Sequence, residues 1–174
     1  MDLHENWPQI RHLFSDAFRS SLHYAIATVD ENGEPHVTPI GSLVLGRPGS
    51  AFYFEKFTRR MPRNLADGSR VCVLAVNSSR WFWIRSLFGG RFRQPPAIRL
   101  YGTAGTLRAA TPREIALWQK RVRPLRFSKG HALMWRDMDQ VREIHFDRIE
   151  PVNIGPMTVE LWTHLAPPQE SASR

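Results

Sequence analysis

The sequence is poor in cysteine and in long apolar stretches. Cys72 is the single cysteine among 174 residues, so no internal disulfide can form and nothing calls for an oxidising compartment. The apolar runs are short, as at residues 71–76, and none is long enough for a transmembrane helix. The N-terminus carries acids and has no basic region followed by an apolar stretch, so we expect no secretory signal. These absences predict a cytoplasmic protein with no membrane partner.

Patterns that mark common catalytic machinery are also absent. The sequence has no GxGxxG dinucleotide fingerprint, no P-loop, no GxSxG nucleophile elbow and no HExxH zinc motif. Its seven histidines are scattered without the spacing of metal ligands. Cys72 lies within the run VCVLAV, where a packing role is typical. We therefore expect no metal site, and we assign no catalytic residue.

Acids are scarce in the middle of the chain, where arginines concentrate. The whole sequence has a net charge of +8, and residues 59–99 hold nine arginines, no lysine and one acid, Asp67. This segment carries the entire positive excess, which indicates an anionic partner such as a phosphate group, a nucleic acid or a membrane surface. Guanidinium groups bind phosphate in a bidentate fork and stack on flat rings. A solvated face, or ion pairs across a dimer interface, is the alternative interpretation of these arginines.

The remaining composition is that of a globular protein. Apolar residues make up 42% of the chain and charged residues 23%, and a chain of this length buries roughly 70% of the surface that it exposes when unfolded. We expect one domain over residues 1–165, with an N-terminal helix at 8–22. A loose Pro/Ser-rich tail follows at residues 166–174.

Strand patterns dominate the chain and come in hairpins. Apolar and β-branched runs predict about six strands, at residues 24–29, 36–45, 51–57, 70–77, 98–107 and 141–149, with an extended continuation at 151–157. The near-continuous apolar run at 70–77 is typical of a strand that is buried on both faces. Further short helices are expected at 62–67 and 111–121, the second from the capping sequence Thr111–Glu114. Because the strands do not alternate with helices, we predict a small closed or half-open antiparallel barrel.

A candidate anion site lies where the third strand leads into a short helix. The sequence there is YFEKFTRRMPRNL, which places a hydroxyl and three guanidinium groups around a helix start. Exposed backbone amides at that start, together with the arginines, predict a site for a phosphate monoester. The alternative is that these arginines only face water. The residues concerned are Thr58, Arg59, Arg60 and Arg63.

The order of several segments resembles the pyridoxamine 5′-phosphate oxidase-like family of FMN-binding split β-barrels. The segments are GEPHVTPIGSL, AFYFEKFTRRMPRNL, the buried strand after them and IRLYGTAGTL, which together span about residues 24–157. The resemblance implies a six-stranded antiparallel split β-barrel of Greek-key type with short flanking α-helices. It also implies an FMN ring along Thr38, Pro39 and Ile40, a polar ring edge beside Phe54, Glu55 and Lys56, and a phosphate on Thr58, Arg59 and Arg60, with Asn64 close behind.

Several positions depart from the oxidases of this family. Thr38 stands where the oxidases carry an arginine, and Leu43 stands where they carry a substrate-binding lysine. Met61 replaces the lysine that follows the phosphate arginine, a role that we assign to Arg63. The C-terminal tryptophan and arginine segment of the oxidases has no counterpart here. The resemblance therefore implies FMN binding without oxidation of pyridoxamine phosphate.

Residues 78–96 are expected to form an irregular insertion in which five aromatic side chains alternate with four arginines. We interpret it as a lid or substrate wall, or as an anchor in a homodimer, in preference to a nucleic-acid groove. The leading hypothesis is a homodimeric FMN-dependent oxidoreductase that transfers hydride or electrons to an unknown small-molecule substrate. The alternative is a non-catalytic carrier of a flavin, the deazaflavin F420 or haem on the same fold.

Overall fold

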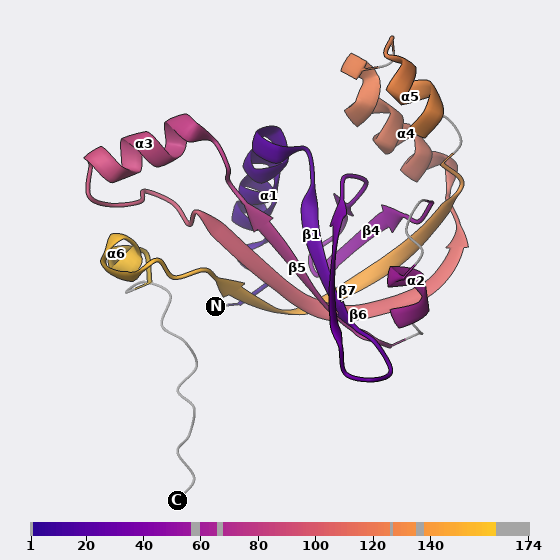
Figure 1. Ribbon diagram of the computed structural model, residues 1–174, viewed down its shortest axis with the longest axis horizontal. Coiled ribbons are helices and arrows are strands. Elements are labelled where there is room, and N and C mark those ends of the chain that lie inside the picture. The colour runs from indigo at the N-terminus through magenta and orange to yellow at the C-terminus, as the bar shows by residue number, and fades with distance from the viewer. Residues whose placement is uncertain (1, 57–59, 66–67, 126, 135–137, 163–174) are drawn as a thin grey trace, which may run out of the picture.

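The computed structural model describes residues 2–56, 60–65, 68–125, 127–134 and 138–162. These residues form one antiparallel sheet with helices around it (Figure 1). Along the sheet the strand order is β2-β1-β5-β6-β7-β4-β3. The strands are β1 (Tyr24–Val29), β2 (Pro35–Ile40), β3 (Val44–Leu45), β4 (Ser50–Phe54), β5 (Arg70–Val76), β6 (Ala97–Ala109) and β7 (Gln140–Pro151). The helices are α1 (Trp7–Ser21), α2 (Met61–Asn64), α3 (Arg80–Phe88), α4 (Pro112–Val122), α5 (Lys129–Met134) and α6 (Val159–Trp162), with 3₁₀ turns at Arg123–Leu125 and Gly155–Thr158.

The mainly antiparallel β fold is confirmed, with seven strands in the part of the chain that the structure describes, where six were expected. The predicted arm at residues 36–45 is split, because β2 ends at Ile40 and the separate strand β3 pairs with β4. Ser42 lies in the break, and its hydroxyl bonds both the N–H and the C=O of Phe54, at 3.1 and 3.0 Å. This side-chain bridge replaces the ladder hydrogen bonds of a continuous strand.

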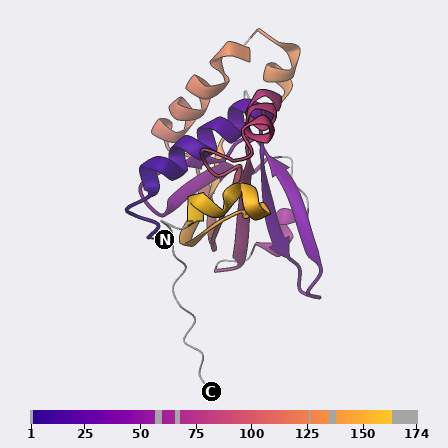
Figure 2. The ribbon, with the colours of Figure 1, turned by 90° about the vertical axis from the view of Figure 1, so that its left-hand side faces the viewer.

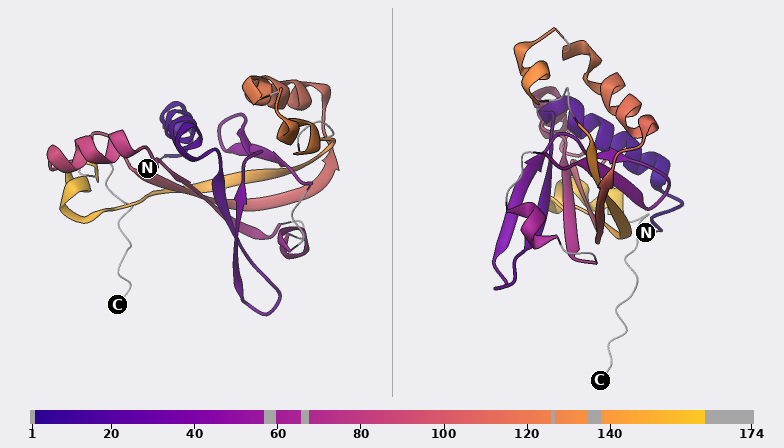
Figure 3. Two further views of the ribbon diagram at one scale, coloured as in Figure 1. Left: turned by 45° about the horizontal axis from the view of Figure 1, so that its top comes forward. Right: turned by 90° about the vertical axis from the view of Figure 1, so that its right-hand side faces the viewer.

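Helix α1 closes one side of the sheet, as Figures 2 and 3 show. Its apolar positions recur at helical spacing and bury one stripe of the helix against the sheet. The Tyr24 hydroxyl of β1 donates to the Phe14 carbonyl at 2.9 Å, which fixes the helix against the first strand. The buried residues of α1 are Trp7, Ile10, Leu13, Phe14 and Ala17.

Strand β5 is buried on one face and half-buried on the other, so the expected burial on both faces is wrong. Its buried residues alternate with the half-buried Cys72, Leu74 and Val76. This outer row continues onto β1, where Ala25 and Ala27 pair with Leu74 and Cys72. Within the described residues no helix covers this face, so an apolar row remains partly open.

The segment at residues 78–96 contains helix α3, so the expected irregular insertion is wrong for its first half. Ser79 caps the helix by accepting a hydrogen bond from the Phe82 N–H at 3.5 Å. Two further expectations need correction. Among the described residues, six helices stand where three were expected, and a 3₁₀ turn at Gly155–Thr158 interrupts the extended segment at 151–157.

Helix α4 begins with the predicted capping box. The Thr111 hydroxyl accepts from the Glu114 N–H, and the Glu114 carboxylate accepts from the Thr111 N–H at 2.8 Å. Arg108 donates to both oxygens of the same carboxylate, at 2.7 and 3.0 Å. These bonds, with Arg108 first, lower the pKa of Glu114 to about 2. The ionised carboxylate therefore holds the start of α4 onto β6.

We expect the contribution of Glu114 to stability to disappear in acid. Its pKa is depressed in the folded protein, so its contribution is complete above about pH 4.5 and is lost as the pH falls towards about 2. Glu114→Gln should lower the free energy of unfolding by about 1 kcal/mol at pH 7. Urea denaturation of both proteins across this pH range checks the difference, which should shrink towards zero. A difference that stays constant with pH would contradict the assignment.

Candidate functional site

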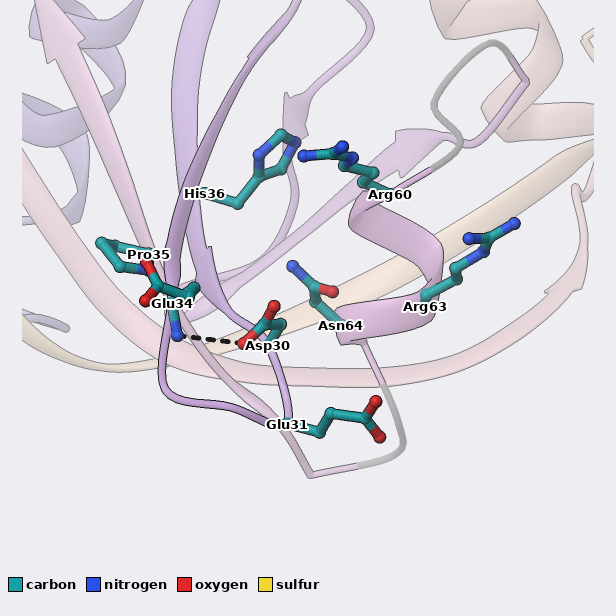
Figure 4. A pocket seen from close by; sticks show the side chains of 8 residues that line it. All are labelled: Asp30, Glu31, Glu34, Pro35, His36, Arg60, Arg63 and Asn64. Atoms are coloured by element: carbon teal, nitrogen blue, oxygen red, sulfur yellow. Dashed lines mark hydrogen bonds between the residues drawn. The ribbon is translucent and has the colours of Figure 1, made fainter.

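A cavity of about 560 Å³ lies between helix α2 and the β1–β2 turn (Figure 4). Basic, amide and imidazole groups come from α2 and β2, and carboxylates come from the turn. The lining residues are Asp30, Glu31, Glu34, Pro35, His36, Arg60, Arg63 and Asn64. Arg60 and Arg63 among them were predicted from the sequence to hold a phosphate, with Asn64 close behind. The structure therefore brings the described part of the predicted phosphate turn to one cavity.

Helix α2 is a single turn held by its apolar side chains. Met61 and Leu65 are buried in the core, which leaves Arg60 and Arg63 exposed on the cavity side. The N–H groups of Arg63 and Asn64 both donate to the Arg60 carbonyl, at 3.0 and 3.2 Å. These two amides are already bonded within the turn, so the expected cradle of free helix-start amides is wrong for them. The guanidinium groups remain as the donors for an anion.

His36 joins this site from β2, although no local sequence pattern predicts it there. Figure 4 shows its ring and the Arg60 guanidinium pointing towards each other across the cavity. Asn64 lies beside them, and its side-chain amide donates to the Thr28 hydroxyl of β1 at 3.1 Å. This bond fixes α2 against the hairpin that carries His36. The site is therefore built from two elements that are more than twenty residues apart in the sequence.

The carboxylates of the cavity lie towards the β1–β2 turn. The Asp30 carboxylate accepts from the N–H groups of Asn32 and Glu34, at 2.8 and 2.9 Å, so it is engaged in shaping the turn. Figure 4 shows Asp30 and Glu31 at the end of the cavity opposite His36 and Arg60. The cavity is therefore polar along its length, with its cationic end at α2.

Strand β2 presents its predicted cofactor residues on two faces. It is an edge strand, which explains how Pro39 is tolerated without a ladder donor. Thr38 lies on the same strand face as His36 and the buried Ile40, whereas Pro39 is exposed on the opposite face. The Thr38 hydroxyl oxygen is buried and has no hydrogen-bond partner among the described residues. A buried hydroxyl without a partner is costly, and a bound ligand with a polar atom would satisfy it.

Phe54 and Glu55 do not face this cavity. The Phe54 ring packs on Trp118 of α4, with 5.8 Å between the ring centroids. Glu55 is 6% exposed and forms a bidentate ion pair with Arg142 of β7, at 2.8 and 3.1 Å. Lys56 is exposed beyond the end of β4. Of the three residues expected along the polar ring edge, two therefore serve the interior of the protein.

The Glu55–Arg142 pair belongs to a buried network. The Tyr53 hydroxyl donates to Glu55 at 2.6 Å, and burial, with this hydrogen bond, raises the pKa of Tyr53. Arg142 also donates to the carbonyls of Leu65 and Gly105, both at 3.0 Å. Because Leu65 directly follows α2, this network fixes the end of the cavity helix to β7.

The predicted site residues Thr58 and Arg59 lie outside the described residues. The described residues nevertheless offer a donor set that suits a phosphate monoester, with two guanidinium groups, an imidazole and an amide at one cavity. The partnerless Thr38 hydroxyl on the same strand face as His36 adds a further group for a bound ligand. On these grounds the residues fit an FMN phosphate.

The described residues hold neither a cluster of metal ligands nor a helix that could span a membrane. No group of three or more histidine, cysteine, aspartate or glutamate side chains there is arranged to hold a metal ion. None of the described helices combines the length and apolar character that crossing a bilayer requires.

Comparisons with known proteins point to one family. Residues 12–153 match the family model described as pyridoxamine 5′-phosphate oxidase. Among solved structures, HupZ of Group A Streptococcus aligns with a TM-score of 0.54 and 18% identity, covering 85% of this chain and 98% of its own. An FMN-binding protein of Syntrophomonas wolfei subsp. wolfei aligns with a TM-score of 0.53 and 14% identity, covering 86% and 94%. No curated protein matches this sequence. At these identities the structural matches establish the shared fold.

Proposed function

We propose that this chain binds FMN and acts as an oxidoreductase. It belongs to the pyridoxamine 5′-phosphate oxidase family, whose model matches most of the length of the chain. The single observation that carries the proposal is the meeting of Arg60, Arg63, Asn64 and His36 at one cavity. When bound, the flavin supplies hydride or electron transfer, and the protein supplies its binding and orientation.

In this proposal the residues of the cavity have different roles in binding the cofactor. Arg60 and Arg63 hold the phosphate, because guanidinium groups match its oxygens in charge and geometry. Asn64 stays fixed to Thr28 and keeps the α2 side chains in place. His36 offers one ring nitrogen to the phosphate side, and the buried Thr38 hydroxyl bonds a polar atom further along the cofactor. Thr58 and Arg59, which the resemblance assigns to the same phosphate, would complete the turn.

Pyridoxamine phosphate is a poor match for the substrate. The family resemblance places a substrate lysine where this chain has Leu43 and a phosphate lysine where it has Met61. Both side chains are fully buried in the core, so neither position presents a group to a ligand. We therefore propose a different small molecule as the substrate, held without these two lysine contacts.

A second copy of the chain is proposed as the partner. The outer row of β5 and β1 exposes apolar side chains in part, among them Cys72, Leu74 and Val76. An apolar sheet face that no helix covers is stabilised when another copy buries it. A homodimer through this face would also supply a second wall for a flat ring, since a single small barrel offers only one.

The bound cofactor can be identified directly. We expect purified protein to release FMN on denaturation, recognised by its mass, and to show a flavin spectrum before release. If the protein is purified empty, added FMN should bind with quenching of flavin fluorescence. Release of haem or of the deazaflavin F420 would replace the proposal with a carrier or F420 function. Failure to bind any of the three would overturn the cofactor assignment.

A further inference from the structure

A second cavity, of about 550 Å³, lies between helix α3 and the turn that follows it. It is far from the FMN cavity, since α3 and α2 lie at opposite ends of the sheet (Figures 1 and 3). Its walls carry Trp81, Phe82, Arg85, Arg91, Arg93 and Gln94. Aromatic rings and guanidinium groups thus share one concavity whose size is that of a small-molecule site.

The frame of this cavity is fixed to the body of the protein. Phe82 and Trp83 pack on Phe92, with ring centroids 5.5 and 5.1 Å apart. The Trp83 indole N–H donates to the Asn77 carbonyl at 2.7 Å, and the Phe92 N–H donates to the Met157 carbonyl at 2.9 Å. Both the helix and the turn are therefore anchored, which holds the side chains between them in a defined arrangement.

The turn is also bonded to the helix. The Arg91 N–H donates to the Ser86 carbonyl at 3.2 Å, so the two walls of the cavity are tied to each other. Trp81 is 74% exposed, which leaves one large flat surface open beside the arginines. An open indole next to guanidinium groups is a surface on which a second flat ring can stack.

The chain segment that forms this cavity is rich in arginine. Residues 68–113 contain no acid, so the segment supplies no carboxylate of its own. The arginines that lie on strands in this stretch pair with carboxylates from other segments. Arg70 pairs with Asp147, and Arg99 pairs with Glu150. Within the described chain, neither Arg85 nor Arg93 forms an ion pair with a carboxylate. Two arginines that line a concave aromatic site favour an anionic occupant.

One carboxylate that is bonded to the wall of this cavity is already engaged. Asp16 of α1 accepts a hydrogen bond from the Gln94 side chain at 3.1 Å and pairs with Arg19 at 2.6 Å. Gln94 thus joins the wall of the cavity to α1, and the charge of Asp16 is balanced by a residue of its own helix. This pairing leaves Arg85 and Arg93 for a ligand.

We propose that this cavity binds a planar organic anion. Its ring lies against Trp81 and Phe82, and its carboxylate or phosphate lies on Arg85 and Arg93. A guanidinium group binds either anion through paired N–H donors, and an aromatic ring is stabilised by the indole face. The site is distinct from the FMN cavity and does not depend on the FMN proposal.

A membrane surface is the competing occupant of α3. Ile84, Leu87 and Phe88 are exposed on the same helix, with Phe88 at 91%, but none of the three lines the cavity. A flat bilayer would contact this ridge and would leave the concave aromatic wall unfilled. The aromatic and basic residues that do line the cavity therefore favour a small planar ligand.

The test uses 2-naphthoate and 2-naphthamide, which share a ring and differ in charge. We expect calorimetry to give one naphthoate site per chain and about tenfold weaker binding of the amide, as loss of a charge-assisted hydrogen bond predicts. Arg85→Gln and Arg93→Gln should each weaken naphthoate binding about tenfold. The matched control is Arg80→Gln, an exposed arginine of the same helix outside the cavity, which should leave the affinity unchanged.

Three results would overturn the proposal. They are equal binding of the amide and the acid, equal weakening by Arg80→Gln and Arg85→Gln, and no binding of naphthoate at all. A further experiment measures sedimentation of the protein with vesicles of phosphatidylglycerol and phosphatidylcholine. Helix α3 would be assigned to a membrane surface if two results came together. The protein would sediment with these vesicles unless it carried Phe88→Ser, and Arg85→Gln would not weaken naphthoate binding. Circular dichroism of each variant establishes that it is folded.

Discussion

Arg142→Met is expected to destabilise the protein by about 3–5 kcal/mol, because it leaves Glu55 as a buried charge without its partner. Both side chains are almost fully buried, with Arg142 8% and Glu55 6% exposed. The substitution also removes hydrogen bonds to the carbonyls of Leu65 and Gly105. Urea denaturation, followed by circular dichroism, measures the loss.

Arg70→Met is the matched control for this prediction. Arg70 pairs with Asp147 between two strands of the same sheet, but both side chains are more than half exposed. Breaking an exposed pair costs at most about 1 kcal/mol. If the Arg142 variant is no less stable than the Arg70 variant, the buried network does not stabilise the fold. Should Arg142→Met fail to fold, Glu55→Gln provides the same comparison with a smaller change.

This network shows where prediction from the sequence succeeded and where it stopped. A strand was predicted over residues 51–57, whereas β4 ends at Phe54. Alternation along Ala51, Tyr53 and Glu55 could have placed all three side chains inward. Its partner could not be predicted, since Arg142 lies 87 residues further along the chain and meets Glu55 only through the pairing of β4 with β7. Glu55 was instead assigned to the edge of the flavin ring.

Helices could be predicted where capping residues at their ends lie within a few positions of one another in the sequence. The helix that begins at Thr111 was predicted because its capping box is contained in four residues. Helix α3 was missed because apolar side chains lie on both its inner and its outer face, so the sequence shows no amphipathic period. Its Ser79 cap and the following Gly89 were the signals that could have revealed it.

The candidate site was predicted in part for the same reason. Arg60, Arg63 and Asn64 are neighbours in the sequence, so one motif contains all three. His36 reaches them only through the β1–β2 hairpin and the Asn64–Thr28 hydrogen bond, which no local pattern reveals. The half-buried face of β5 was also missed, because an apolar run does not show whether a further layer covers it.

The second large effect is expected at the cavity that we propose for FMN. Arg60→Ala combined with Arg63→Ala should weaken FMN binding by about 100-fold or more, because each guanidinium group makes charge-assisted hydrogen bonds to the phosphate. Both side chains are exposed, so the variant should unfold at the same urea concentration as the original protein. Fluorescence titration with FMN measures the affinity.

A second pair of arginines controls for the loss of charge alone. Arg47 and Arg113 are exposed and line a different cavity, beside the start of α4. Arg47→Ala combined with Arg113→Ala lowers the net charge equally and should leave FMN affinity almost unchanged at physiological ionic strength. Equal weakening in both double variants would mean that long-range charge, rather than contact with the phosphate, attracts the cofactor.

The most direct measurement is the ratio of the affinities for FMN and riboflavin, which differ only by the phosphate. The account predicts that FMN binds at least about 100-fold more tightly to the unaltered protein. It also predicts that Arg60→Ala with Arg63→Ala lowers this ratio by about 100-fold while riboflavin binding stays the same. Equal affinities of the unaltered protein for the two compounds would contradict the assignment of the α2 arginines to the phosphate.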